Sequence, residues 1–399
     1  MKSVYLDHSA TTFIDPLVKE AMLPYLGELY GNPSSFHVVG KQVKDDMDEA
    51  LDSIAGQLGS RSDEIVFTSG GTESDNLAIL GYARKNQEAG KHLITTKIEH
   101  HAVLEAMMHL EKKEGFEVTY LEPDREGMIT VDQVRNALRE DTILVSVMYA
   151  NNEIGTVLPI AEIGNMIQKW RQENNRLALR FHTDACQAGE YLDLNVERLH
   201  VDMLTLNGSK IYGPKGIGLL YLKRGIKLQP LQFGGAQERG LRPGTQNVAG
   251  IIGLAKALQI AQKNRKVETE RLVPLRNALI KGLQKTITKT RLNGHAVDRL
   301  PNNVNISFMD VEGEALLLYL DAKGVYASTG SACTSASLDP SHVILALGLP
   351  YEVAHGSIRF SLGRSTTQKD VDYVIEVLPA LVEKLRSLSP VNVDEKYFL

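Results

Sequence analysis

The sequence predicts an α/β protein built on a largely parallel sheet, and three observations support this prediction. Up to about Asn247, short apolar runs alternate with longer amphipathic stretches, the order typical of α/β folds. Asp184 follows one of these runs directly, at the strand end where ligands bind in open parallel sheets. A hydrophobic fraction of 43% over 399 residues is also enough to bury a large core.

The apolar runs predict seven strands, at residues 64–68, 92–96, 117–121, 143–149, 179–183, 203–206 and 218–222. Helical patterns fill most of the gaps, as at 131–138 and 161–172. A long charged helix is expected from Ala249 to about Thr288, and it should lead the chain out of the first domain. Beyond it we expect strands at 303–308 and 357–361, a Gly/Ser/Thr-rich segment at 328–337, and a closing helix at 368–388.

Composition excludes several function classes. The net charge of −5 gives no basis for binding nucleic acid or an anionic membrane surface. No apolar window reaches the roughly 18 residues of a membrane-spanning helix, and the first residues lack the pattern of a signal peptide. The two cysteines, Cys186 and Cys333, cannot form a disulfide framework, and no Cys/His cluster has metal-ligand spacing. We therefore expect a soluble protein of a reducing compartment, the cytoplasm.

A glycine-rich stretch at 68–76 lies between a predicted strand and a helix. Its sequence is Thr-Ser-Gly-Gly-Thr-Glu-Ser-Asp-Asn. Glycines allow a ligand to approach the backbone, and the helix start offers unpaired N–H groups to a phosphate. An ordinary strand–helix turn with Thr72 as the N-cap explains the same residues equally well.

Lys210 follows an apolar strand in a Gly/Pro-rich turn. This setting suits a lysine that forms a Schiff base and whose pKa is lowered by its pocket. A surface lysine in a hairpin is the alternative, and for this segment alone it is favoured because lysines are common. Asp184 likewise has two interpretations: it could hold a pyridine nitrogen protonated, or it could cap the next turn.

The two cysteines have opposite surroundings. Cys333 lies within 328–337, where Gly, Ser, Ala and Thr surround one thiol, whereas a structural free cysteine usually sits among apolar residues. An exposed thiol of this kind suits sulfur relay, although a merely flexible loop also fits. Cys186 comes directly after a predicted core strand, so we interpret it as structural.

Together these segments resemble the cysteine desulfurases of iron–sulfur assembly, the NifS/IscS-like group of the class-V aminotransferase family. The resemblance runs nearly end to end, and each motif is weak alone but hard to obtain by chance at these spacings. The motifs lie at residues 5–12, 31–35, 72–76, 99–100, 151–155, 184, 187, 210–216, 242–245, 330–335 and 359–364.

The resemblance implies a fold-type-I pyridoxal-phosphate enzyme with a mainly parallel seven-stranded sheet and a smaller α+β domain. The large domain would span 13–258; residues 1–12 and 259–399 would form the small domain with a mobile cysteine loop at about 328–340. A homodimer with active sites at the subunit interface is also implied.

The resemblance also assigns site residues by position. Lys210 would bind the cofactor as a Schiff base, His100 would stack on its ring as an acid/base, and Asp184 would pair with the ring nitrogen. Further cofactor contacts are implied for Gly71, Thr72, Asn152, Gln187, Asn207, Ser209 and, from the other subunit, Thr245. Substrate contacts are implied for Asn32, Asn152 and Arg359.

The implied reaction converts L-cysteine to L-alanine and leaves the sulfur on Cys333 as a persulfide. A sulfur acceptor or iron–sulfur scaffold protein would receive it. No metal site is expected, although Cys333 could act as a transient cluster ligand. Two departures from the family pattern stand out: Ser209 replaces the usual histidine before the lysine, which predicts weaker cofactor binding, and the short C-terminal end differs from the scaffold-docking extension of the family.

Three other functions are compatible with parts of the pattern. Selenocysteine lysis and transamination use the same fold and cofactor, but a transaminase has no use for a mobile thiol. A catalytically silent partner is the third alternative. Lys210, Asp184, His100 and Cys333 argue against it because a silent copy needs none of the four, and an absorbance band near roughly 400 nm from the bound cofactor would exclude it.

Overall fold

The larger part of the molecule is a seven-stranded sheet. The computed structural model describes residues 3–330, 340–390 and 392–397. The strand order is β2-β8-β7-β6-β5-β3-β4, and β8 alone runs antiparallel to its neighbours. This confirms the predicted α/β class with a mainly parallel sheet. The strands are β2 (Ile65–Thr68), β3 (His92–Thr96), β4 (Glu117–Leu121), β5 (Thr142–Ser146), β6 (Arg180–Asp184), β7 (Met203–Asn207) and β8 (Gly218–Leu222).

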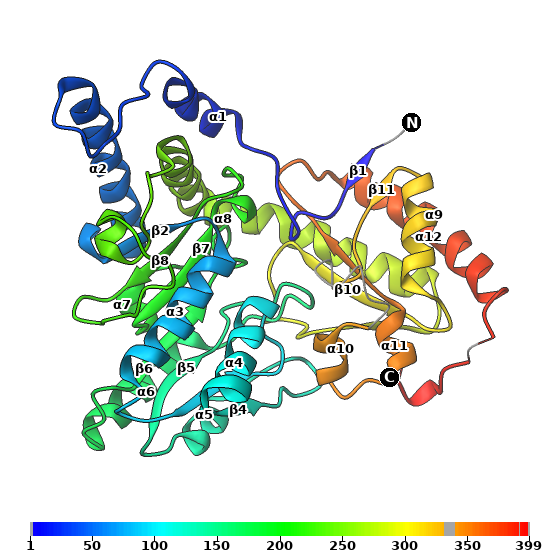
Figure 1. The fold of residues 1–399 in the computed structure, drawn as a ribbon. Helices are drawn as coiled ribbons and strands as arrows, with labels where there is room; N and C mark the ends of the chain where they lie inside the picture. Colours follow the sequence, from blue (N-terminus) through cyan, green and yellow to red (C-terminus); the bar gives the residue numbers. More distant parts are fainter. Residues whose placement is uncertain (1–2, 331–339, 391, 398–399) are drawn as a thin grey trace.

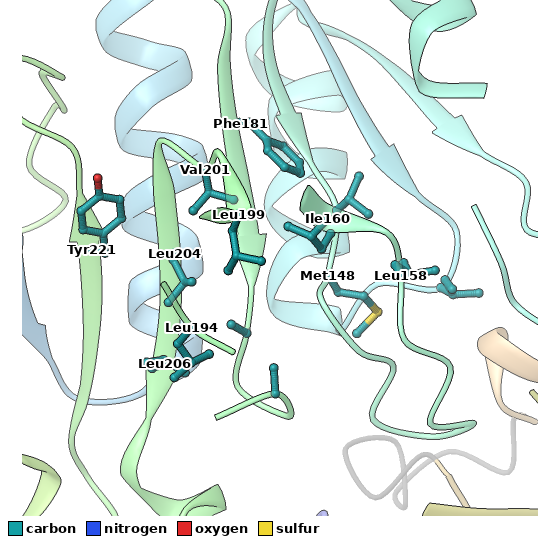
Figure 2. Packing of buried hydrophobic residues seen from close by; sticks show 14 of the residues in the cluster. Met148, Leu158, Ile160, Phe181, Leu194, Leu199, Val201, Leu204, Leu206 and Tyr221 are labelled. Carbon is teal, nitrogen blue, oxygen red and sulfur yellow. The ribbon is translucent and has the colours of Figure 1, made fainter. Parts of the chain in front are cut away.

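Helices cover both faces of this sheet, because neighbouring residues of a strand point to opposite faces. Val66, Leu93 and Leu144 pack with α3 (Gly71–Asn86) and α4 (His101–Glu114). The next residue along each strand packs on the other face, against the helices that cover it. Figure 2 shows part of that second core, with Phe181, Leu204 and Leu206 of the sheet among its members. The helices of this face are α2 (Val38–Leu58), α5 (Val131–Ala137), α6 (Ile160–Glu173), α7 (Val196–Leu199) and the first half of α8 (Val248–Thr286).

The smaller part of the molecule is built on a three-stranded antiparallel sheet of order β12-β10-β9. It has its own hydrophobic core, and it lies on the right in Figure 1. Its elements are β9 (Thr290–Leu292), β10 (Asn303–Phe308), α9 (Gly313–Ala322), β11 (Val325–Tyr326), α10 (His342–Ala346), α11 (Tyr351–His355), β12 (Ser357–Ser361), α12 (Gln368–Arg386) and the 3₁₀ turn η6 (Glu395–Tyr397).

The N-terminal segment belongs to both parts. Strand β1 (Val4–Tyr5) pairs in parallel with β11 in the smaller part. The chain then crosses to the larger part, where α1 (Pro16–Met22) and η1 (Leu23–Leu26) precede α2 (Figure 1). The remaining 3₁₀ turns are η2 (Ser62–Glu64), η3 (Gly208–Lys210) and η4 (Gln237–Gly240). Among the described residues, no helix is long and apolar enough to cross a bilayer.

Helix α8 joins the two parts. Its first half buries Ile251, Leu254 and Leu258 in the core of the large sheet, and its second half buries Leu275 and Leu279 in the smaller core. The expected long helix is therefore present, with bounds within two residues of those predicted. The proposed division at 258/259 stays a prediction.

Candidate active site

The three polar motifs of the large part meet at one edge of the sheet. Strands β2, β6 and β7 are mutually parallel, so Thr68, Asp184 and Asn207 lie at their carboxyl ends. Thr68 and Asn207 both pair with Gly218, which brings the start of α3 beside the turn that contains Lys210. Ligands bind at this edge in open α/β sheets.

Gly71 lies close to residues of two neighbouring motifs. A Cβ atom placed on Gly71 would lie 2.8 Å from Cys186 Sγ and 3.4 Å from Asn207 Nδ2, so only glycine fits there without displacement. The N-terminus of α3, with its unpaired N–H groups, therefore opens beside Asn207, whose buried Oδ1 has no hydrogen-bond partner among the described residues. The N–H groups at the helix start and the Nδ2 donor of Asn207, which lies beside Gly71, fit a phosphate group, whereas the unpartnered Oδ1 is an acceptor and does not contribute to this fit. Thr72, in the same turn, is exposed.

Lys210 lies under the N-terminal segment. It ends η3, directly after β7, and its Nζ donates a hydrogen bond to the carbonyl oxygen of Ala10. Thr12 holds the same turn, because its backbone N–H donates to Ser209 O at 3.0 Å. Gln187 Nε2 donates to Ser9 O at 3.0 Å. The segment that begins in the small part therefore covers the lysine turn of the large part.

His100 is the N-cap of α4. Its Nδ1 accepts a hydrogen bond from Ala102 N at 3.1 Å, so this nitrogen carries no proton and a neutral ring is protonated at Nε2. His100 is half-buried. The exchangeable proton is therefore at the nitrogen that does not serve the cap.

Two buried acids that the sequence analysis did not assign lie near Asp184. Asp75, 1% exposed, lies 3.6 Å from His182 Nε2. Burial, followed by the charge of Asp184, raises the pKa of Asp75 well above its usual value, and burial lowers the pKa of His182 to about 3. The contact therefore joins two neutral side chains and is not an ion pair.

Glu99 is the second of these acids. It is fully buried, and its Oε1 accepts hydrogen bonds from Thr96 Oγ1 at 3.0 Å and from Met148 N at 2.8 Å. Burial raises its pKa to about 8 even though these bonds oppose the shift. Asp184 lies at the same edge of the sheet, where its Oδ1 accepts a hydrogen bond from Cys186 N at 2.9 Å.

The raised pKa of Glu99 predicts a pH-dependent stability. A protein in which a carboxyl binds its proton more tightly when folded loses stability as pH rises from the unfolded pKa, about 4.5, to the folded pKa, about 8. Glu99→Gln should remove this component, which is at most about 5 kcal/mol of unfolding free energy at 1.4 kcal/mol per pKa unit. Urea unfolding at pH 5 and pH 8 measures it, and an equally steep decline in the variant would contradict the assignment.

Arg359 connects the two parts of the molecule at this edge. It lies on β12, is 2% exposed, and forms an ion pair with Asp7 (Nη2–Oδ1, 2.9 Å). Its Nη1 donates to Asn152 O at 3.0 Å. Its buried Nε has no hydrogen-bond partner among the described residues. A buried guanidinium with an unused donor suits an incoming carboxylate.

Two of the remaining predicted residues, Asn32 and Thr245, are exposed, and a third is not described. Asn32 is exposed before α2, where its Oδ1 accepts from Ser34 N at 2.9 Å, and Thr245 is exposed on the segment that follows η4. Cys333 lies outside the described residues. Cys186 is buried as expected, and burial together with Asp184 raises the pKa of its thiol well above the usual value.

Comparisons with known proteins agree with this arrangement. The sequence profile of the family described as aminotransferase class-V matches residues 4–374. A protein of Methanosarcina thermophila named cysteine desulfurase IscS is 53% identical over 99% of this chain and 95% of its own length.

Two solved structures extend the agreement to the fold. One titled NifS-like protein superposes with a TM-score of 0.89 at 35% identity, covering 96% of this chain and 100% of that one. A second, titled SspA in complex with cysteine, has a TM-score of 0.79 at 36% identity, covering 90% of this chain and 99% of that one. The chain therefore belongs to the class-V aminotransferase family, within the group of NifS/IscS-like cysteine desulfurases.

Proposed function

We propose that this protein is a cysteine desulfurase that converts L-cysteine to L-alanine and retains the sulfur on Cys333 as a persulfide. The observation that carries the proposal is the meeting of Lys210, Asp184 and the start of α3 at one sheet edge. They meet in a chain that is 53% identical, over 99% of its length, to a protein named cysteine desulfurase. The solved neighbour titled as a complex with cysteine supports the same substrate.

The enzyme depends on pyridoxal 5'-phosphate, the cofactor of its family. The residues present fit this group: the start of α3 with Gly71 and Thr72, together with Asn207 and Ser209, would hold the phosphate. Asn152 and Gln187 would contact the ring and the substrate side, and Thr245 would come from a second subunit. When bound, the cofactor withdraws electrons from the substrate's α-carbon.

The side chains around this site would have different tasks. Asp184, fixed by the N–H of Cys186, would keep a positive charge on the ring nitrogen. Lys210 would bind the cofactor covalently and, once displaced by the substrate amine, take the α-proton on Nζ. His100 would face the ring and exchange a proton at Nε2, because Nδ1 is used by the helix cap.

Arg359 would bind the substrate carboxylate through Nε, the donor that the described residues leave unused. Its Nη2 already pairs with Asp7 and its Nη1 already donates to Asn152 O. The guanidinium is therefore fixed in place before the substrate arrives. Asn32 would contribute a further substrate contact.

Sulfur transfer would then involve the thiolate of Cys333. Its Sγ attacks the substrate sulfur, the new S–S bond forms, and the C–S bond of the substrate breaks. The electron pair of that bond stays with the carbon, which takes up a proton and leaves as alanine. Substrate and thiol together thus give alanine and a persulfide, and neither an oxidant nor a metal is consumed.

A homodimer would complete the site. The segment 13–39 exposes large apolar side chains, among them Phe13, Leu17, Tyr30 and Phe36, the last two 79% and 106% exposed. A cluster of this kind on one segment is typical of an interface. A second copy covering it is the simplest way to bring Thr245 to a partner's phosphate site.

A sulfur acceptor or iron–sulfur scaffold protein would remove the sulfur in a reducing compartment, the cytoplasm. Both cysteines would stay reduced there, as the chemistry of Cys333 requires. Ser209 in place of histidine would make cofactor binding weaker than is usual in the family.

The direct test is product analysis. Purified protein incubated with L-cysteine and a thiol reductant should release alanine and sulfide in equal amounts. Release of sulfide with pyruvate and ammonia instead of alanine would contradict the proposal. Failure to form alanine and sulfide, with the cofactor bound, would also contradict the proposal.

A further inference from the structure

Glu153 lies in a turn that other side chains hold rigidly. Asn151 Oδ1 accepts hydrogen bonds from Glu153 N at 2.8 Å and from Ile154 N at 2.9 Å. The carbonyl oxygen of Glu153 accepts from the amides of Asn303 and Asn305 on β10, at 3.0 and 3.1 Å. Because the backbone is fixed from both parts of the molecule, the Glu153 side chain, in a residue only 3% exposed, has a defined position.

The carboxylate of Glu153 accepts a hydrogen bond from Ser341 Oγ at 2.5 Å. Ser341 is also the N-cap of α10, since the same Oγ accepts from Ile344 N at 3.2 Å. A hydroxyl has one proton and two lone pairs, so directing the proton at Glu153 leaves a lone pair for the cap. Glu153 therefore orients the start of α10.

Helix α10 is also tied to the candidate active site. His342 Nε2 lies 3.0 Å from the carbonyl oxygen of Glu99, the residue before His100. The rings of His342 and His101 are 4.6 Å apart. The first turn of α10 is thus positioned on the same segment that positions His100.

The same carboxylate contacts Gly330. A Cβ atom built on Gly330 would collide with Glu153 Oε2, so the glycine backbone lies directly against the carboxylate. Arg359 Nη1 approaches Gly330 O at 3.5 Å. In the sequence, Cys333 lies between Gly330 and Ser341. One buried side chain therefore touches both ends of the segment that contains the proposed sulfur carrier.

We infer that Glu153 is a positioning residue for sulfur transfer, because it fixes Gly330 and Ser341, the described residues on either side of Cys333 in the sequence. The inference rests on the proposed function, and it concerns the sulfur-transfer step and not substrate binding. A misplacement of about 1 Å in a reacting group costs up to about 100-fold in rate. Losing the contact should therefore slow persulfide formation while the cofactor and cysteine still bind.

The test compares Glu153→Ala and Glu153→Gln in the holoenzyme. After rapid mixing with L-cysteine and quenching, mass spectrometry follows the persulfide on Cys333, and absorbance follows cysteine binding. Glu153→Ala should form persulfide roughly 10- to 100-fold more slowly, with cysteine affinity within about 3-fold of wild type. Glu153→Gln keeps an oxygen that accepts from Ser341, so it should stay within about 3-fold in rate.

Two further variants separate positioning from general stability. Ser341→Ala removes the same contact from the other side and should slow persulfide formation as Glu153→Ala does, and both should speed amide exchange at Ile344. Glu64→Ala is the matched control: it is also a buried glutamate that accepts from backbone N–H groups, at the amino end of β2. Glu64→Ala should lower the free energy of unfolding and leave the rate of persulfide formation unchanged.

The outcomes are distinct. A wild-type persulfide rate in Glu153→Ala, or in Ser341→Ala if the first variant does not fold, would overturn the inference. An equal loss of rate in Glu64→Ala would do the same. Failure of the wild-type enzyme to form any persulfide would instead overturn the proposed function.

Discussion

Lys210→Ala is expected to lose activity by roughly 10⁴-fold or more while the fold survives. The lysine would supply both the covalent link to the cofactor and the base for the α-proton, and a single general base already contributes up to about 10⁴-fold. The fold should tolerate the change, because Lys210 is half-buried in a 3₁₀ turn, where its Nζ donates a hydrogen bond to the backbone oxygen of Ala10.

Alanine formation from L-cysteine measures the loss, and circular dichroism checks the fold. Lys223→Ala is the matched control, since Lys223 directly follows β8 as the turn of Lys210 follows β7, and the Lys223 side chain is 45% exposed. It should keep full activity. If borohydride still attached the cofactor covalently to the Lys210→Ala chain, the assignment of this lysine would be wrong.

Cys333→Ser is expected to abolish persulfide formation and most alanine release, with cofactor binding unchanged. A serine hydroxyl cannot accept sulfur, since it is a far weaker nucleophile toward a thiol sulfur than a thiolate is. Cofactor absorbance should still respond to added cysteine, because Lys210, Asp184 and Arg359 are intact.

Cys186→Ser provides the comparison. Burial and the Asp184 carboxylate raise the pKa of the Cys186 thiol, so little thiolate forms there. The variant should remain active, although Cys186 Sγ packs beside Gly71 and its loss can weaken phosphate binding slightly. Loss of all alanine formation in Cys186→Ser, with the cofactor still bound, would contradict the assignment of the sulfur chemistry to Cys333.

The strands of the large sheet could be predicted because their signal is local. Short apolar runs mark most strands of this sheet, and the predicted 92–96, 117–121 and 218–222 coincide with β3, β4 and β8, although β4 at the sheet edge is only partly buried. The run 143–149 extends beyond β5, which ends at Ser146. Val147 and Tyr149 still donate to carbonyl oxygens of β6, but outside a continuous ladder.

Helix α2 was not predicted, because polar and charged residues separate its apolar positions. Its buried positions Val43, Ala50, Ile54 and Leu58 nonetheless follow helical spacing and could have revealed it. The pairing of β1 with β11 had no such signal. Each strand has two residues and the partners lie more than 300 positions apart, so only the packed structure brings them together.

The candidate site, like the fold, could be predicted only in part. The sequence singled out Lys210, Asp184 and the start of α3 because each lies at or shortly after the end of an apolar run, and the family resemblance gave them their roles. It did not assign Asp75 and Glu99, whose protonation depends on burial by distant residues. It also missed the ion pair of Arg359 with Asp7, which forms only when the N-terminal segment crosses between the two parts.

The most direct test of the central claim is the mass of the cysteine-containing peptides after brief incubation of the holoenzyme with L-cysteine. Alkylation and digestion would follow without reductant. The account predicts an added sulfur of about 32 Da on the peptide containing Cys333 and none on the peptide containing Cys186. An added sulfur on Cys186, or alanine release with no sulfur on Cys333, would contradict it.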